Sequence, residues 1–440
     1  MLAGSTHEPT LARFANEQTM FKFLHAADIH LDSPLKGLEH YDEAPVEEIR
    51  RATRRALENL VQLAIDEQVG FVLLAGDLYD GDWNDFKTGL FFVAQMARLR
   101  DAAIPVYLIA GNHDAASKIT KALRLPENVR MLWHNEPETV RLDELDVAIH
   151  GQSYAKAATT DDLSAAYPAP VPGAFNIGLL HTCATGREGH DRYAPCTVEG
   201  LRAKEYQYWA LGHVHKREVL CEDPPILFPG NLQGRHVRES GPKGCTLVSV
   251  ADEHHVQVEP RSVDVFRWET CRVDSSRAET GDDLLDQLRE RLDKLVDQAD
   301  GRPLAVRVEV VGSSRVHQTV ASEPLRWENE IRALGQDIGD GNVWIEKVRL
   351  RTSPPVDIEA AQSIDGPIGE LLRLVKESRS DPELLAWLGD QLAPLKDKLP
   401  RDLKEGPDAI GLDSAENLRE TLDHVEQMLI RRLLAGESES

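Results

Sequence analysis

The amino-acid sequence predicts an α/β protein whose core is a largely parallel sheet, and two observations support this class. Short apolar runs of strand length alternate with longer runs whose apolar residues recur at helical spacing. Strands are expected at 21–27, 71–75 and 104–110, and helices at 46–68 and 84–98. Strands separated by helices indicate βαβ units, in which neighbouring strands run parallel.

The remaining chain predicts further units. After residue 123 short strands predominate, at 129–133, 147–150, 175–181, 206–211, 218–221, 225–228, 245–250 and 256–260. A first domain is therefore expected over 21–262. Residues 263–352 predict a small β-α-β-α-β domain, with strands at 263–273, 304–311 and 342–350 and helices at 281–298 and 324–334. Residues 353–440 predict a helical tail, in which Asp381 caps a helix that begins at Pro382. The polar residues 1–20 are expected to be a disordered extension.

The charge of the chain limits how it could bind nucleic acid. The net charge is −24 over 440 residues, which argues against a broad basic nucleic-acid clamp. It does not exclude an enzyme that binds phosphate through metal ions, because bound ions add positive charge. Residues 201–250 are locally positive, at +2, whereas 251–300 and 351–440 carry −7 and −8. We therefore expect any contact with DNA to be local.

The five cysteines include no C-x-x-C pair, which argues against a disulfide framework or a zinc knuckle and favours a reducing cytoplasm. No run of about 18 apolar residues occurs, so no membrane span is expected.

Five short segments contain residues that bind metals, and four of them directly follow an apolar strand-like run. They are Asp28-Ile29-His30, Gly76-Asp77-Leu78, Gly111-Asn112-His113-Asp114, His181, and Gly212-His213-Val214-His215. Ligands bind at the carboxyl ends of strands in open α/β sheets, so these side chains should converge at one edge. Each segment alone is a weak indication of a metal site, since a single buried histidine is more often a core residue than a ligand. All five together predict a metal site.

The spacing within the segments has a mechanical reading. In D-x-H and H-x-H, alternation along an extended backbone would put both ligands on one side. Gly76, Gly111 and Gly212 would permit sharp turns where the strands end. Imidazole, carboxylate and amide ligands suit manganese, iron or zinc. The set is too large for one ion, and with Asp77 as a bridge it divides into two sites.

In order and composition, the five segments resemble those of the calcineurin-like metallophosphoesterase superfamily, over about residues 21–262. The resemblance implies a β-sandwich flanked by helices and two divalent metal ions, for which Mn²⁺ is expected. One ion would be held by Asp28, His30, Asp77 and His215, and the other by Asp77, Asn112, His181 and His213. A hydroxide that bridges the ions would attack phosphorus. His113 would act as general acid for the departing oxygen, and Asp114 would orient it.

Longer runs resemble one branch of the superfamily. The phosphoprotein phosphatases carry GDxVDRG and GNHE, whereas this chain reads Gly76-Asp77-Leu78-Tyr79-Asp80 and ends its third segment in Asp114. Residues 22–32, KFLHAADIHLD, resemble the SbcD-type DNA repair nucleases, and 212–245 resemble the bacterial YhaO-type DNA repair exonucleases. This resemblance implies a DNA exonuclease, and it allows single-strand endonuclease activity as well. It also implies that residues 263–352 form a capping domain that shapes DNA access.

The same resemblance suggests partners. An SbcC-like coiled-coil P-loop ATPase would dock on the C-terminal helices, although the amphipathic stretch 414–434 could equally pack on its own domain. The sequence leaves open whether the chain forms a homodimer. Asp80 departs from the archaeal and eukaryotic relatives, which have a histidine there. A carboxylate at this position would repel phosphate unless it binds metal or pairs with a cation.

The locally positive stretch contains four candidates for phosphate contacts, which are Lys216, Arg217, Arg235 and Arg238. For each of them, solvated surface charge is an equally good reading. Two other functions are compatible with the sequence. One is a small-molecule or cyclic-nucleotide phosphodiesterase, which would need every metal ligand but no capping domain. The other is a DNA-end-binding scaffold with an inactive site, against which the complete ligand set argues.

Overall fold

The computed structural model describes residues 19–33, 51–80, 86–116, 124–184, 194–251, 255–339, 341–354 and 377–398, and isolated positions between 370 and 425. The expected extension at 1–20 lies almost wholly outside the described residues, as does most of the stretch 414–434. Within the described part of the chain, no helix combines the length and the apolar character needed to cross a bilayer.

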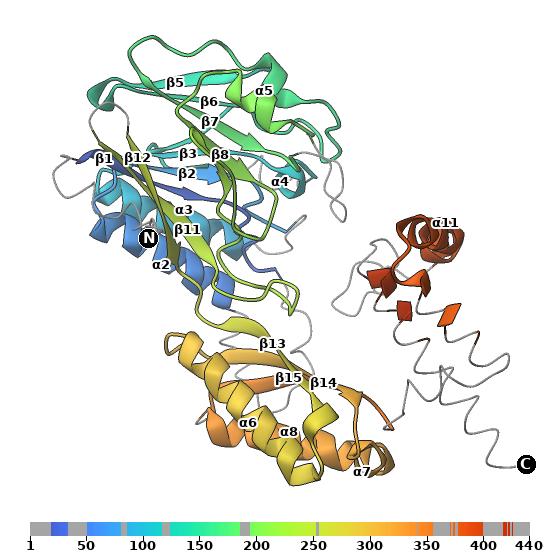
Figure 1. Cartoon of the computed structure of the whole chain (residues 1–440). Helices are drawn as coiled ribbons and strands as arrows, with labels where there is room; N and C mark the ends of the chain where they lie inside the picture. The colour runs from blue at the N-terminus through green and yellow to red at the C-terminus, as the bar shows by residue number, and fades with distance from the viewer. Residues whose placement is uncertain are drawn as a thin grey trace, which may run out of the picture.

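Two six-stranded sheets face each other in a sandwich (Figure 1). The first has the order β12 (Val256–Ser262), β11 (Gly244–Ala251), β1 (Thr19–Ala26), β2 (Phe71–Ala75), β3 (Val106–Ile109) and β4 (Val129–Met131). The second has the order β5 (Glu138–Leu142), β6 (Val147–Gly151), β7 (Phe175–His181), β8 (Tyr208–Gly212), β10 (Pro225–Phe228) and β9 (Glu218–Glu222). The central strands β1 to β4 and β6, β7, β8 and β10 pair in parallel, and antiparallel strands lie at the edges.

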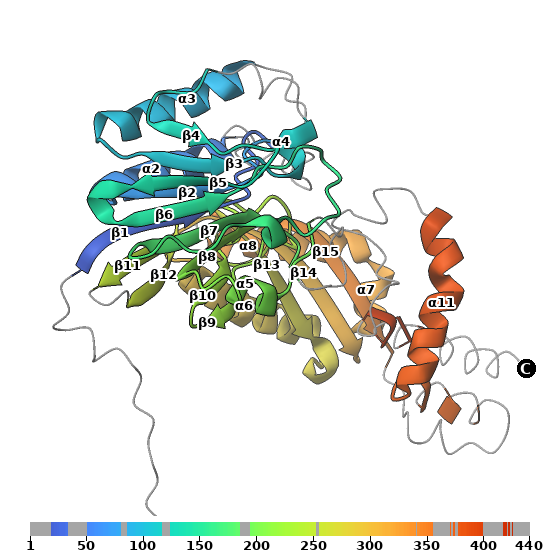
Figure 2. The same ribbon diagram turned by 90° about the horizontal axis from the view of Figure 1, so that it is seen from above.

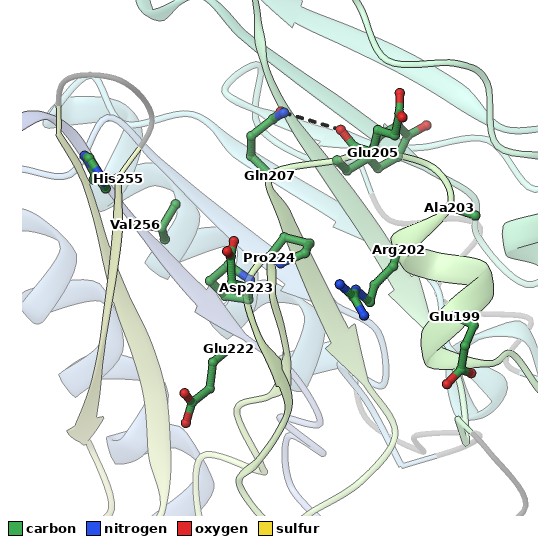
Figure 3. Close-up of a pocket in the computed structure, with 12 residues that line it drawn as sticks. Glu199, Arg202, Ala203, Glu205, Gln207, Glu222, Asp223, Pro224, His255 and Val256 are labelled. Carbon is green, nitrogen blue, oxygen red and sulfur yellow. Dashed lines mark hydrogen bonds between the residues drawn. The ribbon is translucent and has the colours of Figure 1, made fainter.

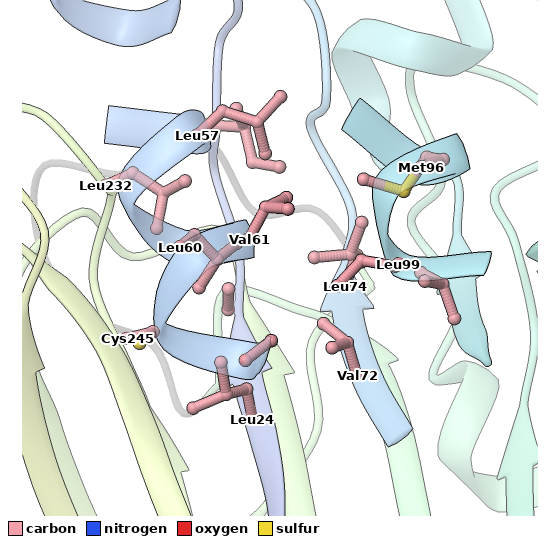
Figure 4. Packing of buried hydrophobic residues seen from close by; sticks show 14 of the residues in the cluster. Leu24, Leu57, Leu60, Val61, Val72, Leu74, Met96, Leu99, Leu232 and Cys245 are labelled. Carbon is pink, nitrogen blue, oxygen red and sulfur yellow. The ribbon is translucent and has the colours of Figure 1, made fainter. Parts of the chain in front are cut away.

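The sandwich has a core between its sheets and a second core under its helices. Phe23, Phe71 and Ile177 contribute to the inner core, together with Tyr208. On the outer face of the first sheet lie α2 (Ala52–Asp66) and α3 (Phe86–Asp101), whose buried residues pack on β1 and β2 (Figure 4). The short helix α5 (Val198–Arg202) covers the outer face of the second sheet. The predicted β-sandwich flanked by helices is confirmed.

The sequence missed only short or polar elements within the described residues. The edge strand β5 reads ETVRL, and only its central valine is buried, so its apolar signal is weak. The helices α4 (Asn112–Ala116), α5 and α7 (His317–Ser322) are five or six residues long, too short for a helical period to show. One of these, α4, carries residues of the metal-ligand segments.

A second unit has a three-stranded parallel sheet in the order β13 (Arg267–Asp274), β14 (Leu304–Ser313) and β15 (Val343–Ser353). The helices α6 (Gly281–Gln298) and α8 (Pro324–Ile338) pack on one face of this sheet. A capping box between Thr280 and Asp283 begins α6. At one end of the other face, Trp268 and Ala305 pack against Val237 of the sandwich, so the two units share a small core.

The C-terminal region contains α11 (Pro382–Lys398). The Asp381 carboxylate accepts hydrogen bonds from the backbone N–H groups of Glu383 and Leu384, at 2.9 and 3.2 Å. The predicted start of this helix is therefore confirmed.

Candidate metal centre

The seven ligands predicted from the sequence lie at one edge of the sandwich, where strands of both sheets end. β2, β3, β7 and β8 all run towards the side of the molecule where α4 lies (Figure 1 and Figure 2). Asp28 and His30 follow β1, Asp77 follows β2, Asn112 begins α4 after β3, His181 ends β7, and His213 and His215 follow β8. Residues up to 187 positions apart in the chain thus meet at a single site.

The ligand atoms form overlapping groups in which all atoms lie within 4.8 Å of one another. The groups are Asp28, His30 and His215; His30, Asp77 and His113; and Asp77, His181 and His213. The first and last correspond to the two halves of the centre, which we call the His215 half and the His181 half.

Asp77 connects the two halves. Its Oδ2 lies 4.0 Å from His30 Nε2 and 3.5 Å from His181 Nε2. Its Oδ1 accepts a hydrogen bond from the backbone N–H of His113 at 3.0 Å. The Asn112 Oδ1 lies 3.0 Å from His181 Nε2, which adds an amide oxygen to the His181 half. Asp77 is therefore placed where one carboxylate would be shared by both halves.

These residues fit a pair of divalent cations. The Nε2 atoms of His30 and His215 lie 3.1 Å apart, beside the Asp28 carboxylate. The other ring nitrogen of His30, Nδ1, lies 3.7 Å from Asp80 Oδ1, so the nitrogen on the side of the two other ligands is Nε2. The donor set of imidazole, carboxylate and amide suits manganese, iron or zinc.

The electrostatics of the site also favour cations. Burial raises the pKa of Asp28 to about 6. Burial would lower the pKa of His181, but the Asp77 carboxylate outweighs it and raises this pKa to about 9. Burial opposes the charge of Asp77 too, yet the histidines around it hold its pKa well below the usual range. The buried carboxylates therefore need positive charge, which a protonated imidazole or a metal ion can supply.

The backbone at the ligands is not extended as the D-x-H spacing suggested. Asp28, His30 and Asp77 have positive φ values of 50°, 45° and 51°. Each non-glycine residue in this region costs about 1–3 kcal/mol, and such strain persists only where the surroundings enforce it. Here the two loops hold each other, because His30 N–H donates to the Asp77 carbonyl at 3.1 Å and Leu31 N–H to the Leu78 carbonyl at 2.9 Å. The extended-strand explanation was wrong, and left-handed turns bring the ligands together.

The glycines next to the ligands act in two ways. Gly76 has a φ of 90°, so the predicted sharp turn is confirmed there. Gly212 has no positive φ, and its role is close approach, because a Cβ atom at this position would overlap the carbonyl oxygen of Ala75. That carbonyl accepts a hydrogen bond from His181 Nδ1 at 2.8 Å. Gly212 therefore leaves room for the group that holds His181.

His113 lies on α4 between the two halves, with 40% of its side chain exposed. Its Nδ1 is 3.2 Å from Asp80 Oδ1. Burial works against the charged form of His113, but the hydrogen bond with Asp80 and the charge of Asp77 outweigh it and raise the pKa of this imidazole. Asp80 also lies 3.9 Å from Arg235. It therefore pairs with a cation, which is one of the two ways in which a carboxylate at this position would avoid repelling phosphate.

Asp114 does not face His113. Its carboxylate accepts hydrogen bonds from the backbone N–H groups of Leu78, Tyr79 and Gly111, at 3.0 to 3.1 Å. It thus ties the loop after β2 to the end of β3. The expectation that Asp114 orients His113 is corrected, because the carboxylate next to that ring belongs to Asp80.

The four candidate phosphate contacts occupy different environments. Arg235 lies at the centre, with 14% of its side chain exposed, between Glu239 at 3.0 Å and Asp80 at 3.9 Å. Lys216 and Arg238 are exposed. Arg217 instead points towards β11, where it donates to Thr246 Oγ1 at 2.6 Å. None of its described contacts is with a metal ligand, and its contact with phosphate stays a prediction.

Sequence reasoning missed the residues that surround His215. Glu239 Oε1 lies 2.7 Å from His215 Nδ1, and Lys243 Nζ donates to the His215 carbonyl at 2.9 Å. Neither residue follows a strand or shares a spacing with the ligands. The signal that was present is the run 229–245, which carries the resemblance to YhaO-type proteins and contains both.

A separate cavity of about 800 Å³ lies where β8 and β10 begin, away from the metal ligands at the other ends of the strands (Figure 3). Its acidic lining disfavours phosphate, since Glu199, Glu205, Glu222 and Asp223 contribute to it and Arg202 is its one arginine.

Comparisons with known proteins agree with this geometry. The family model for calcineurin-like phosphoesterases matches residues 21–217, and that for the middle domain of the metallophosphoesterase YhaO matches 268–353. The uncharacterized metallophosphoesterase YhaO of Bacillus subtilis is 37% identical over 300 residues, which are 67% of this chain and 73% of that protein.

More distant relatives are DNA double-strand break repair proteins named Mre11. That of Sulfurisphaera tokodaii is 26% identical over 250 residues, 53% of this chain and 60% of the relative. That of Haloferax volcanii is 25% identical over 276 residues, 62% of this chain and 58% of the relative. The chain thus spans less than two thirds of these relatives. The comparisons show that the chain belongs to the calcineurin-like metallophosphoesterases, as a YhaO-type member related to the DNA double-strand break repair proteins named Mre11, and is a metal-dependent phosphodiesterase.

Proposed function

We propose that the chain is a two-metal DNA phosphodiesterase, with exonuclease activity, that acts in DNA repair and uses Mn²⁺. The observation that carries the proposal is the pair of ligand groups that share Asp77, with the part-exposed His113 between them. When bound, two divalent cations would polarise the phosphodiester and activate water as the nucleophile.

The chain's own residues supply the other parts of the reaction. His113 is placed to give a proton to the departing oxygen, because its ring is partly exposed and lies within the central ligand group. Asp80 favours the protonated form of this ring and limits its rotation. Arg235, held in place by Glu239, presents a guanidinium to a phosphate oxygen. Lys216 and Arg238 would contact flanking phosphates from the surface.

The second unit supports DNA rather than a small diester as the substrate. It packs against the loop that carries Arg235, since Trp268 Nε1 donates to the Gly234 carbonyl at 2.9 Å. A domain placed beside the site would limit and guide access of a polymer, and a cyclic nucleotide would not need it. We therefore propose residues 263–352 as a capping domain for DNA.

The test compares substrates on one preparation. Purified chain with Mn²⁺ is given end-labelled duplex DNA, single-stranded DNA, cyclic nucleotides and a chromogenic phosphodiester. We expect the labelled duplex to be shortened, with cleavage of single strands as a second activity. Rapid hydrolysis of the small diesters without action on DNA would instead establish a small-molecule phosphodiesterase. DNA binding with fewer than about one bound ion per chain and no hydrolysis would establish a scaffold.

We also propose a partner and a compartment. An SbcC-like coiled-coil P-loop ATPase would dock on the C-terminal helices, where Trp387 of α11 is 54% exposed. The five cysteines are free thiols, which supports a reducing cytoplasm. Co-purification with a coiled-coil ATPase from the same operon, weakened by Trp387→Glu, would support the docking. Equal recovery of the variant complex would contradict it.

A further inference from the structure

Glu239 lies buried in the loop between β10 and β11, where four hydrogen-bond donors lie within 3.0 Å of its carboxylate oxygens and a fifth, Arg235 Nε, lies at 3.4 Å. Its Oε1 accepts from His215 Nδ1 at 2.7 Å and from Arg235 Nη2 at 3.0 Å. Its Oε2 accepts from Asn231 Nδ2 and from the Arg235 backbone N–H, both at 2.8 Å. A carboxylate offers about four lone-pair positions, so all of them are used here.

This arrangement fixes the tautomer of His215. An ionised carboxylate only accepts hydrogen bonds, and Glu239 Oε1 is the nearer neighbour of Nδ1, at 2.7 Å against 3.1 Å for Arg235 Nη2, so we assign the imidazole proton to Nδ1. The lone pair is then on Nε2, the atom that faces His30 and the Asp28 carboxylate. A carboxylate behind a metal-binding histidine both orients the ring and makes it a stronger ligand.

The loop that carries Glu239 is held from two sides. On the side of the metal centre, Lys243 Nζ donates to the His215 carbonyl at 2.9 Å. On the other side, Gln233 Nε2 donates to the Phe266 carbonyl at 2.9 Å, in the segment that leads into β13. Glu239 therefore has little freedom to move away from His215.

We propose that Glu239 is a positioning residue that holds His215 in its metal-binding tautomer and sets Arg235 beside the same half of the centre. The proposal rests on the proposed function, because it takes His215 as a metal ligand. It adds a residue outside the predicted ligand set, and it makes one carboxylate responsible for both a metal ligand and a phosphate-binding cation.

Glu239→Gln is a sharp test, because an amide of the same shape cannot accept from all four donors. With its NH₂ group at the Oε2 position, the amide would place a donor against the donors of Asn231 and the Arg235 backbone, and those hydrogen bonds would be lost. With its NH₂ group at the Oε1 position, it would force His215 Nδ1 to accept, and the proton would move to Nε2. Either result weakens the His215 half. The matched control is Glu346→Gln, since Glu346 is a buried carboxylate of the second unit whose described hydrogen bonds are with Arg307 and not with a metal ligand.

The experiment titrates metal-stripped full-length chain with Mn²⁺ by calorimetry and records the visible spectrum with Co²⁺. Glu239→Gln should lose about 10–100-fold in affinity for one ion and retain the other, with an altered Co²⁺ spectrum. On the cleavage substrate it should raise KM as well as lower kcat, because Arg235 is also released. Glu346→Gln should lower the melting temperature while both affinities stay as in the wild type.

A second measurement does not depend on the variant's folding. Nitrogen NMR of the metal-free wild type, with His215 assigned through His215→Ala, should show the proton on Nδ1. A proton on Nε2, or wild-type affinity for both ions in Glu239→Gln, would overturn the proposal. Failure of the proposed function is distinguishable, because His215→Ala would then bind both ions as tightly as the wild type.

Discussion

The two halves of the metal centre hold their histidines in different ways. In the His181 half, the ring Nδ1 bonds to the carbonyl of Ala75 at 2.8 Å, a main-chain group of the central strand β2. In the His215 half, the equivalent atom bonds to the Glu239 side chain at 2.7 Å, on a loop outside the sheets. A main-chain group of the sheet therefore holds His181, whereas a side chain that a mutation can replace holds His215.

The largest effect is expected from Asp77→Asn. Asp77 belongs to both halves of the centre, so its loss should weaken metal binding in both. The amide cannot bridge two cations, so metal content should fall below about one ion per chain and cleavage should fall to background. Elemental analysis and the DNA assay measure this. Asp66→Asn, the same change at an exposed position of α2, is the control. Full metal content in Asp77→Asn would show that Asp77 is no bridge.

Gly212→Ala tests the half that the main chain holds. The added methyl group would overlap the Ala75 carbonyl and displace the acceptor of His181. We expect a loss of stability of about 1–3 kcal/mol, together with weaker binding of the ion in the His181 half. Thermal unfolding of the metal-free chain and calorimetry with Mn²⁺ measure the two effects. Glu239→Gln should instead weaken binding of the ion in the His215 half. Loss of the same ion in both variants would contradict the difference between the two halves.

Asp80→Asn tests the ring that lies between the halves. Asp80 raises the pKa of His113, so its neutralisation should lower that pKa and make His113 lose its proton at lower pH. A general acid must be protonated, so the alkaline limb of the kcat profile should move to lower pH while activity at acidic pH changes little. An unchanged alkaline limb would mean that His113 is not the acid. Asp114→Asn should instead lower stability, because Asp114 bonds to backbone N–H groups.

The smallest effect is expected from Lys216→Ala, at the exposed position next to His215. Loss of one phosphate contact should weaken DNA binding modestly and reduce the log–log salt slope by about one, with kcat unchanged. Arg217→Ala is the neighbouring comparison, since Arg217 bonds to Thr246 and its loss should lower stability. A change in the slope of this variant would make Arg217 a DNA contact as well. An unchanged slope in Lys216→Ala would remove it from the proposed DNA contacts.

The difference between the halves also explains what could be predicted from the sequence. The ligands were predictable because most of them lie at or just after the end of a strand of buried apolar residues, as Asp77 follows FVLLA. The largely parallel strands and the second unit followed from strand and helix periods, and the sandwich followed from the resemblance to the metallophosphoesterase superfamily. The group that holds His181 was not predictable, because every residue has a carbonyl and only the fold brings that of Ala75 to this ring. Glu239 was not predictable either, because an irregular loop places it.

The misread details have similar causes. The D-x-H spacing suggested an extended strand, but contacts between the loops after β1 and β2 impose left-handed turns on Asp28 and His30. Asp114 follows His113 directly, so it was taken as the partner of that ring. The first turn of α4 aims its carboxylate at backbone N–H groups instead. Sequence proximity identified the segment correctly but assigned the contact to the wrong carboxylate.

The central claim is that two cations and His113 cleave DNA together, and one paired measurement tests it most directly. Wild type and His113→Ala are loaded with Mn²⁺, and bound metal and cleavage of end-labelled duplex are measured in the same samples. We predict about two ions per chain in both proteins and a loss of about 10²–10⁴-fold in cleavage by the variant. Equal cleavage by the two proteins, or fewer than about one ion in the wild type, would contradict the account.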